Sequence, residues 1–145
     1  GKRTVPSAMG LYPLEIYGFT AEGVYKYNPE SHTLTKVTDK DLRAKSGSQE
    51  FVAGAPLDLV IYADYNKFVT GDPDVDNIIR GEEDRMSLLD AGAVTENIYL
   101  YCSSEQINVV ERAMVDEKAL SEALGLSSNL HFIVAMSIGY PPIPA

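Results

Sequence analysis

The segment from Pro6 to Glu15 holds the residues whose types and order best suit ligand binding. It reads Pro-Ser-Ala-Met-Gly-Leu-Tyr-Pro-Leu-Glu, so small residues and a glycine stand directly before an aromatic residue and a strand-like run. Such a loop can bring backbone N–H groups and the Ser7 hydroxyl close to a planar ligand or a phosphate. By composition alone, the same segment also suits an ordinary loop that enters a strand.

Side chains suited to acid–base, nucleophilic or metal chemistry are scarce. The sequence has no phosphate-binding loop ending in Lys-Ser/Thr, no Gly-x-Ser-x-Gly elbow and no His-Glu-x-x-His motif. Its two histidines, His32 and His131, give little support for a metal site or a Ser-His-Asp triad, and His131 is expected to be structural within a strand. We therefore expect no catalytic side chain and no metal, so an enzymatic role would require a cofactor.

The charge of the chain restricts its partners. Twelve basic and 21 acidic residues among 145 give a formal charge of −9, which disfavours nucleic acid and anionic membrane surfaces. No apolar run approaches the roughly 20 residues that span a bilayer. No basic-then-apolar leader is present, although a leader removed earlier is also compatible. The single cysteine, Cys102, excludes an internal disulfide and is expected to be buried. We expect a cytoplasmic protein.

The elements that must position these residues follow from the apolar pattern. Strands are predicted at residues 14–19, 23–27, 32–37, 57–63, 107–110 and 130–138. The second and third form a hairpin, and the fourth is apolar enough for an interior strand covered on both faces. A short helix capped by Asp39 is predicted at residues 39–43, and a surface loop or flap at residues 70–76.

Two further helices are predicted in the second half of the chain. Residues 84–104 form the dominant one, and its apolar residues leave little room for a polar face, so it should be largely buried. Residues 116–125 form a shorter helix capped by Asp116 and ended by Gly125. The order of elements favours one α+β domain over residues 1–145, with a mixed or antiparallel sheet around the long helix. A partner subunit would cover what so small a sheet cannot.

Several segments together resemble the nitroreductase superfamily, in the branch that includes the peptide thiazole/oxazole-forming dehydrogenases. Pro-Ser-Ala followed by Leu-Tyr-Pro-Leu-Glu is similar to the flavin-binding loop of that family. The similarity continues in order through four more segments of the sequence, which are residues 23–27, 90–100, 109–116 and 124–126. It ends at Ile138-Gly139-Tyr140-Pro141, so it covers nearly the whole chain.

The resemblance implies FMN, an intertwined homodimer with two flavin sites at its interface, and hydride transfer from NADH or NADPH to a small-molecule acceptor. By position, Pro6, Ser7, Ala8 and Gly10 would lie against the flavin or its phosphate. The ring would be lined by Glu111, Arg112, Ala113 and Met114. Arg112 is either a source of positive charge for the ring or a surface arginine, and Tyr12 either walls the substrate pocket or lies in the core.

This sequence departs from the family in one important respect. The two N-terminal helices and the Arg-Arg-Ser segment that usually holds the FMN phosphate are not present, and the chain begins in mid-loop. We expect an N-terminally incomplete domain of an FMN-dependent NAD(P)H oxidoreductase acting on nitroaromatics or quinones. The alternatives are azoline oxidation in peptides, a non-enzymatic flavin-binding or structural module, and an acidic protein-interaction domain.

Overall fold

Short strands with alternating side chains build one antiparallel sheet. The computed structural model describes residues 3–141, and within that range six strands form the sheet in the order β3-β2-β1-β4-β6-β5. Their bounds are β1 Leu14–Thr20, β2 Gly23–Asn28, β3 Thr33–Thr38, β4 Leu57–Asp64, β5 Asn108–Arg112 and β6 Leu130–Gly139. All neighbouring pairs are antiparallel, which confirms the predicted hairpin and the α+β class and settles the sheet as antiparallel.

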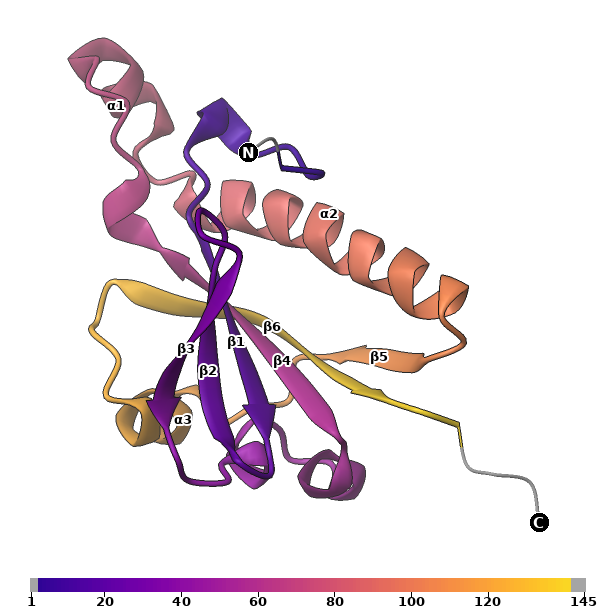
Figure 1. Ribbon diagram of the computed structural model, residues 1–145. Helices are drawn as coiled ribbons and strands as arrows, with labels where there is room; N and C mark the ends of the chain where they lie inside the picture. The colour runs from indigo at the N-terminus through magenta and orange to yellow at the C-terminus, as the bar shows by residue number, and fades with distance from the viewer. Residues whose placement is uncertain (1–2, 142–145) are drawn as a thin grey trace.

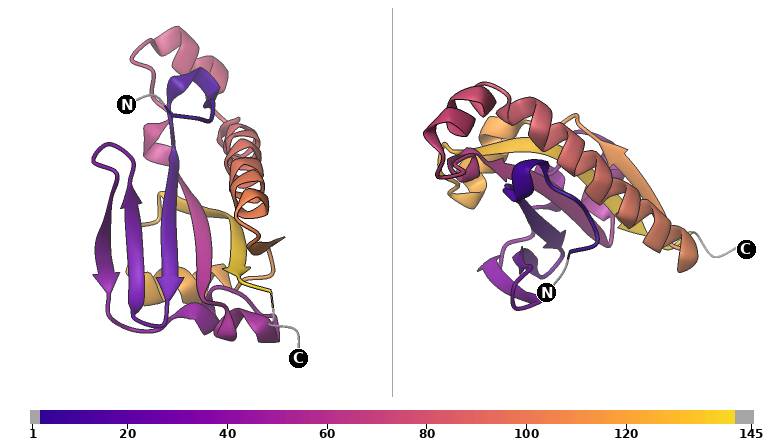
Figure 2. Two further views of the ribbon diagram at one scale, coloured as in Figure 1. Left: turned by 45° about the vertical axis from the view of Figure 1, so that its right-hand side comes forward. Right: turned by 90° about the horizontal axis from the view of Figure 1, so that it is seen from above.

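Alternation along β4 separates two apolar layers on the two faces of the sheet. Val60 and Tyr62 pack with Tyr17, Phe19 and the leucines of α3 (Glu117–Leu124). On the opposite face, Ile61 packs with Val134 and with Ala91 of α2 (Glu83–Ser104). Figures 1 and 2 show α2 lying diagonally over one face of the sheet and α3 on the other. As predicted, β4 is an interior strand, and Cys102 is buried.

Local capping fixes the two shorter helices. The Asp116 carboxylate accepts a hydrogen bond from the Ala119 backbone N–H at 3.0 Å, and Gly125 ends α3 at a left-handed φ of 65°. Both features agree with the prediction for residues 116–125. In α1 (Pro73–Ile79), Asp72 caps the helix and Pro73 occupies its first turn.

Two local predictions are wrong. Residues 73–76 of the loop predicted at 70–76 belong to α1, because Asp72 and Pro73 are a cap and a first-turn residue that favour a helix start. No helix begins at Asp39; a 3-10 turn spans Arg43–Lys45. There Asp41 accepts hydrogen bonds from the backbone N–H and the guanidinium of Arg43, which closes a local turn in competition with a helix.

The long helix is present as predicted, but it is not buried within one chain. Leu88, Leu89, Leu100 and Tyr101 are exposed along its outer face, with Leu89 retaining 67% of its accessible surface. The helix therefore covers the sheet instead of being surrounded by it. No helix in the described part of the chain is both long and apolar enough to cross a membrane.

Candidate functional site

An aspartate on α2 holds the N-terminal loop (residues 3–13). The Ser7 hydroxyl donates to Oδ2 of Asp90 at 2.5 Å, and the Ala8 backbone N–H donates to Oδ1 at 2.9 Å. The Ser7 oxygen in turn accepts a hydrogen bond from the Tyr12 backbone N–H at 2.8 Å. Asp90 is nearly buried, with 6% of its surface exposed. The Asp90 carboxylate thus anchors the start of the turn directly, and the Ser7 hydroxyl links that start to Tyr12 at the end.

Between these fixed points the loop adopts an unusual backbone. Met9, Gly10 and Tyr12 all have positive φ values, at 53°, 68° and 48°. The left-handed region costs a residue with a side chain about 1–2 kcal/mol, so Met9 and Tyr12 are strained and only Gly10 adopts it freely. The Tyr12 ring is half-buried beneath the Arg3 guanidinium, 4.2 Å from the ring centroid. It lies outside both core clusters, so the core alternative for Tyr12 is not the one observed.

A depression of about 260 Å³ lies between α2 and the end of β5. Its α2 side comes from Leu88, Ala91, Gly92 and Thr95, and its sheet side from Glu111, Ala113, Ile133 and Val134. Small residues form much of the lining, and a Cβ placed on Gly92 would meet no atom within 4 Å. The surface above Gly92 is therefore open to a flat molecule or to another chain.

The predicted segment from Glu111 to Met114 lies partly in this depression. Glu111 and Ala113 line it, whereas the Met114 side chain is exposed. The Glu111 backbone N–H donates to the Tyr99 hydroxyl at 2.7 Å, and the Met114 carbonyl accepts from the Ser48 backbone N–H at 3.0 Å. These two bonds tie the segment to α2 on one side and to the loop after the Arg43–Lys45 turn on the other.

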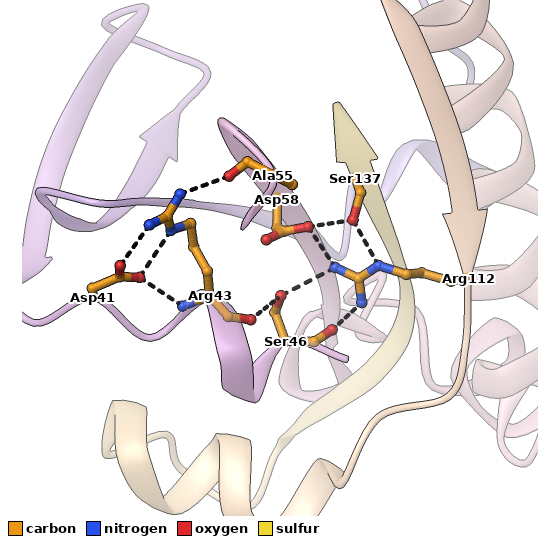
Figure 3. A network of polar contacts seen from close by, with 7 residues as sticks. All are labelled: Asp41, Arg43, Ser46, Ala55, Asp58, Arg112 and Ser137. Atoms are coloured by element: carbon orange, nitrogen blue, oxygen red, sulfur yellow. Dashed lines mark hydrogen bonds and ion pairs between the residues drawn. The ribbon is translucent and has the colours of Figure 1, made fainter. Parts of the chain in front are cut away.

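Arg112 points to the opposite face of the sheet. Because side chains alternate along a strand, Arg112 lies away from the depression that its neighbours Glu111 and Ala113 line. Its guanidinium donates to the Asp58 carboxylate at 2.7 Å, to the Ser137 hydroxyl at 2.9 Å and to both the hydroxyl and carbonyl oxygens of Ser46 (Figure 3). Arg112 is 6% exposed. This corrects both alternatives for its side chain, since it is neither a surface arginine nor a free positive charge beside the depression.

Asp58 is the anionic half of this network. It is fully buried on β4, and its Oδ1 accepts hydrogen bonds from Arg112 and from the Ser137 hydroxyl. Burial raises the pKa of the Asp58 carboxyl, while the bonds from Ser137 and Arg112 oppose that rise. Its Oδ2 is buried without a hydrogen-bond partner among the described residues. The network therefore works as a structural joint between β4, β5, β6 and the loop at Ser46.

The two predicted cofactor segments lie on opposite flanks of α2 within one chain. In Figure 1 the N-terminal loop runs along one side of α2 and β5 along the other, and the view from above in Figure 2 shows the same arrangement. Asp90 bonds the loop, and the adjacent Ala91 lines the depression. The same turn of α2 thus supports both segments without bringing Pro6–Gly10 and Glu111–Met114 into one cavity of a single chain.

Sequence reasoning missed three residues that organise this region. Asp90 and Tyr99 lie on the long helix, where the apolar pattern predicts packing and gives no sign of a polar contact. Asp58 is a single acidic residue inside an apolar strand. A charged residue in an otherwise apolar interior strand requires a partner, so Asp58 was the most readable of the three. The two histidines of the chain make contacts outside this region. His131 stacks on Tyr65 at 3.8 Å between ring centroids, and His32 contacts the Tyr27 hydroxyl.

Comparisons with known proteins identify the family of this chain. The model of the Nitroreductase family matches residues 2–140. Several relatives carry the name putative nitroreductase, and two of them are similar to this chain over most of its length. One, from Methanocaldococcus jannaschii, is 35% identical over 136 residues, or 86% of this chain and 64% of its own length. The other, from Ralstonia eutropha JMP134, has a crystal structure with a TM-score of 0.84 at 32% identity, over 98% of this chain and 64% of that one.

More distant structures share the fold. A chain of the microcin synthetase McbBCD complex of Escherichia coli superposes with a TM-score of 0.82 at 18% identity, over 98% of this chain and 57% of its own. The NADPH:FMN oxidoreductase of Vibrio harveyi, solved with NAD+, gives 0.67 at 22% identity over 97% of this chain and 55% of its own. This chain spans just under two thirds of the length of the Methanocaldococcus jannaschii and Ralstonia eutropha relatives. Together with the ordered match over residues 2–140, these likenesses establish that the chain belongs to the Nitroreductase family.

Proposed function

We propose that this chain is the larger part of a flavin-dependent oxidoreductase that binds FMN between two copies of itself. It would pass hydride from NADH or NADPH to a small acceptor such as a nitroaromatic or a quinone. The observation that carries the proposal is the depression beside Gly92, whose lining of small and apolar residues is open on the side that faces away from the sheet. Family membership and the Vibrio harveyi relative's flavin and nicotinamide use support the same chemistry.

The described residues fit the ring of a flavin. Ala91, Gly92 and Ala113 offer a floor without bulky side chains, which a planar ring can approach closely. The backbone of Glu111 is held by the Tyr99 hydroxyl, so the segment that would face the ring edge is fixed before a ligand arrives. A bound flavin would supply the redox chemistry, and the protein would supply orientation of the two rings and exclusion of water.

The placement of the two segments favours a site shared between copies. The outer face of α2 presents Leu88, Leu89, Leu100 and Tyr101 to solvent, which is an apolar surface of the kind that a partner covers. In a two-fold pair built on this face, the N-terminal loop of one copy can approach the Glu111–Met114 segment of the other. Pro6, Ser7, Ala8 and Gly10 would then complete the depression, with Tyr12 beside the acceptor.

The phosphate end of FMN fits less completely. No lysine or arginine lines the depression, and the amides of Ala8, Gly10, Leu11 and Tyr12 already donate within the chain, so Arg3 is the cationic donor that the N-terminal loop offers among the described residues. This observation favours one alternative, a flavin-binding or structural module without turnover. The family's remaining length, which this chain does not span, is where a further phosphate clamp would lie.

An absorbance scan of the purified protein tests the proposal. We expect yellow protein, or colourless protein that takes up added FMN, with a visible band that bleaches under NADH or NADPH without oxygen. Bands that form but never bleach would favour the module without turnover, and protein that takes up no FMN would overturn the proposal. Nitroaromatics, quinones and an azoline-containing peptide, offered in turn to the reduced protein, separate the candidate acceptors by the rate at which the band returns.

A further inference from the structure

The bond between Asp90 and Ser7 changes how the N-terminal loop can recognise a ligand. The only hydroxyl hydrogen of Ser7 is given to Asp90, and its oxygen accepts the Tyr12 N–H. The Ala8 N–H is also given to Asp90. Neither the Ser7 hydroxyl nor the Ala8 amide is therefore available as a donor to a flavin or a phosphate.

The two hydrogen bonds that Asp90 accepts, from the Ser7 hydroxyl and the Ala8 amide, form a clamp on the strained part of the loop. Met9 and Tyr12 hold left-handed conformations that residues with side chains rarely adopt, and both lie in the turn that the Ser7 hydroxyl closes and that Asp90 anchors at Ser7 and Ala8. Such strain persists only where surrounding contacts hold it. Asp90 is nearly buried and stands on a 22-residue helix, so it is a rigid anchor for this purpose.

We propose that Asp90 is the positioning residue of the cofactor loop, and that Ser7 acts as its partner instead of as a ligand to the flavin. Through these two residues the strained turn directs the Met9–Gly10 backbone and the Tyr12 ring toward the ligand. The inference rests on the proposed flavin site, and it names a residue in that site that neither the composition of the loop nor its order of residues indicates.

A double-mutant cycle with Ser7→Ala and Asp90→Ala tests the assignment through the FMN dissociation constant, measured by quenching of flavin fluorescence. We expect Asp90→Ala to weaken FMN binding about tenfold, as for the loss of a charge-assisted hydrogen bond, and Ser7→Ala to weaken it less. The loss in the double variant should be smaller than the sum of the two single losses, because both changes remove the Ser7–Asp90 hydrogen bond. Asp90→Asn can still accept the Ala8 N–H and should restore both binding and the visible spectrum of the bound flavin.

Two outcomes would overturn the inference. One is a Ser7→Ala loss that adds in full to that of Asp90→Ala, since the hydroxyl would then contact the flavin itself. The other is FMN binding by Asp90→Ala that equals the wild type. If Asp90→Ala does not fold, Asp90→Ser replaces it in the cycle, because the shorter side chain cannot reach the loop.

Hydrogen exchange separates this inference from the proposed function. The Ala8 amide should be protected in the wild type, exposed in Asp90→Ala and protected again in Asp90→Asn, with no flavin present. A wild type that takes up no FMN but shows this pattern would end the proposed function and leave the clamp standing as a structural feature. An unprotected Ala8 amide in a protein that does bind FMN would end the inference alone.

Discussion

Arg112 and Asp58 form a buried ion pair, and the groups around it hold the Arg112 guanidinium in one orientation. The guanidinium is bound by Asp58, Ser137 and Ser46, and a Cβ at Gly47 would overlap it, so a side chain there would have to displace the guanidinium. Buried pairs of this kind contribute little over apolar residues of similar volume, but losing one partner leaves an uncompensated charge. The value of the pair lies in holding β5 and the Ser46 loop in one arrangement.

Replacing Arg112 alone should therefore cost more than replacing the pair. We expect Arg112→Met to lower the free energy of unfolding by about 3–5 kcal/mol, because Asp58 is left buried without a cation. Arg112→Met combined with Asp58→Leu should recover a large part of that loss. Urea denaturation of both variants measures the difference, and equal losses in the single and double variants would contradict the role of the unpaired charge.

Glu111 carries the one ionisable side chain in the lining of the depression. If FMN binds there, the carboxylate disfavours added negative charge on the ring, so Glu111→Gln should raise the midpoint potential of the bound flavin. From roughly 1 kcal/mol between solvent-exposed charges, we expect a rise on the order of 20 mV for a two-electron couple. Glu122→Gln on α3 is the matched control, and a potential shifted equally by both would place the flavin elsewhere.

Three tyrosines near the core should ionise late in an alkaline titration. Burial raises the pKa of Tyr62 to about 12, and burial also raises the pKa values of Tyr17 and Tyr65. The folded state holds the Tyr62 proton more tightly than the unfolded state, so its contribution to stability is complete below pH 10 and is lost as the pH rises through about 12. Ultraviolet absorbance should show a late step that shrinks in Tyr62→Phe, and an unchanged curve would contradict the burial.

At the scale of elements, caps decide where the helices begin and end. Asp116→Ala removes the bond to the Ala119 N–H and should lower the free energy of unfolding by about 1 kcal/mol. Gly125→Ala should cost a similar amount through its left-handed backbone alone, since an added Cβ there meets nothing within 4 Å. Lys118→Ala, an exposed change within the same helix, is the control for thermal denaturation and should have little effect.

The elements that could be read from the sequence are those with local signals. Asp116 and Gly125 mark the two ends of α3 in the sequence, and the apolar run at residues 57–63 predicts an interior strand. The two wrong predictions of local structure also have local causes. Asp72 and Pro73 start a helix where a loop was predicted, and the hydrogen bond from Arg43 to Asp41 closes a turn where a helix was predicted. The clamp at Asp90 could not be read, because its partners lie 82 and 83 residues away in sequence.

At the scale of the whole molecule, the outer face of α2 is the surface whose role matters most. Gly92→Leu adds bulk where one chain offers only open space, so the isolated fold should tolerate it and even gain helix propensity of up to about 1 kcal/mol. A pair built on this face should separate. Sedimentation measures the pair, Glu122→Leu on α3 is the control, and unchanged sedimentation of Gly92→Leu would place the interface elsewhere.

The candidate site shows the same limit of sequence reasoning at a larger scale. Two segments were singled out, and the structure places them against one turn of α2 but on opposite flanks. The resemblance to a family identified the two segments as candidates for cofactor binding. The distance between them depends on how α2 crosses the sheet, which the sequence does not show. The buried side chain of Arg112 shows that membership of a segment does not tell which face of a strand a residue occupies.

The apolar layer on one face of the sheet is buried within a single chain, whereas the layer on the other face leaves apolar side chains exposed. The α3 layer seals its tyrosines and leucines within a single chain, while the α2 layer ends in exposed leucines. If copies associate through α2, the melting temperature should rise with protein concentration, as mass action requires. Dilution would then return the leucines on the outer face of α2 to water, so the fraction of the protein present as pairs would depend on its total concentration.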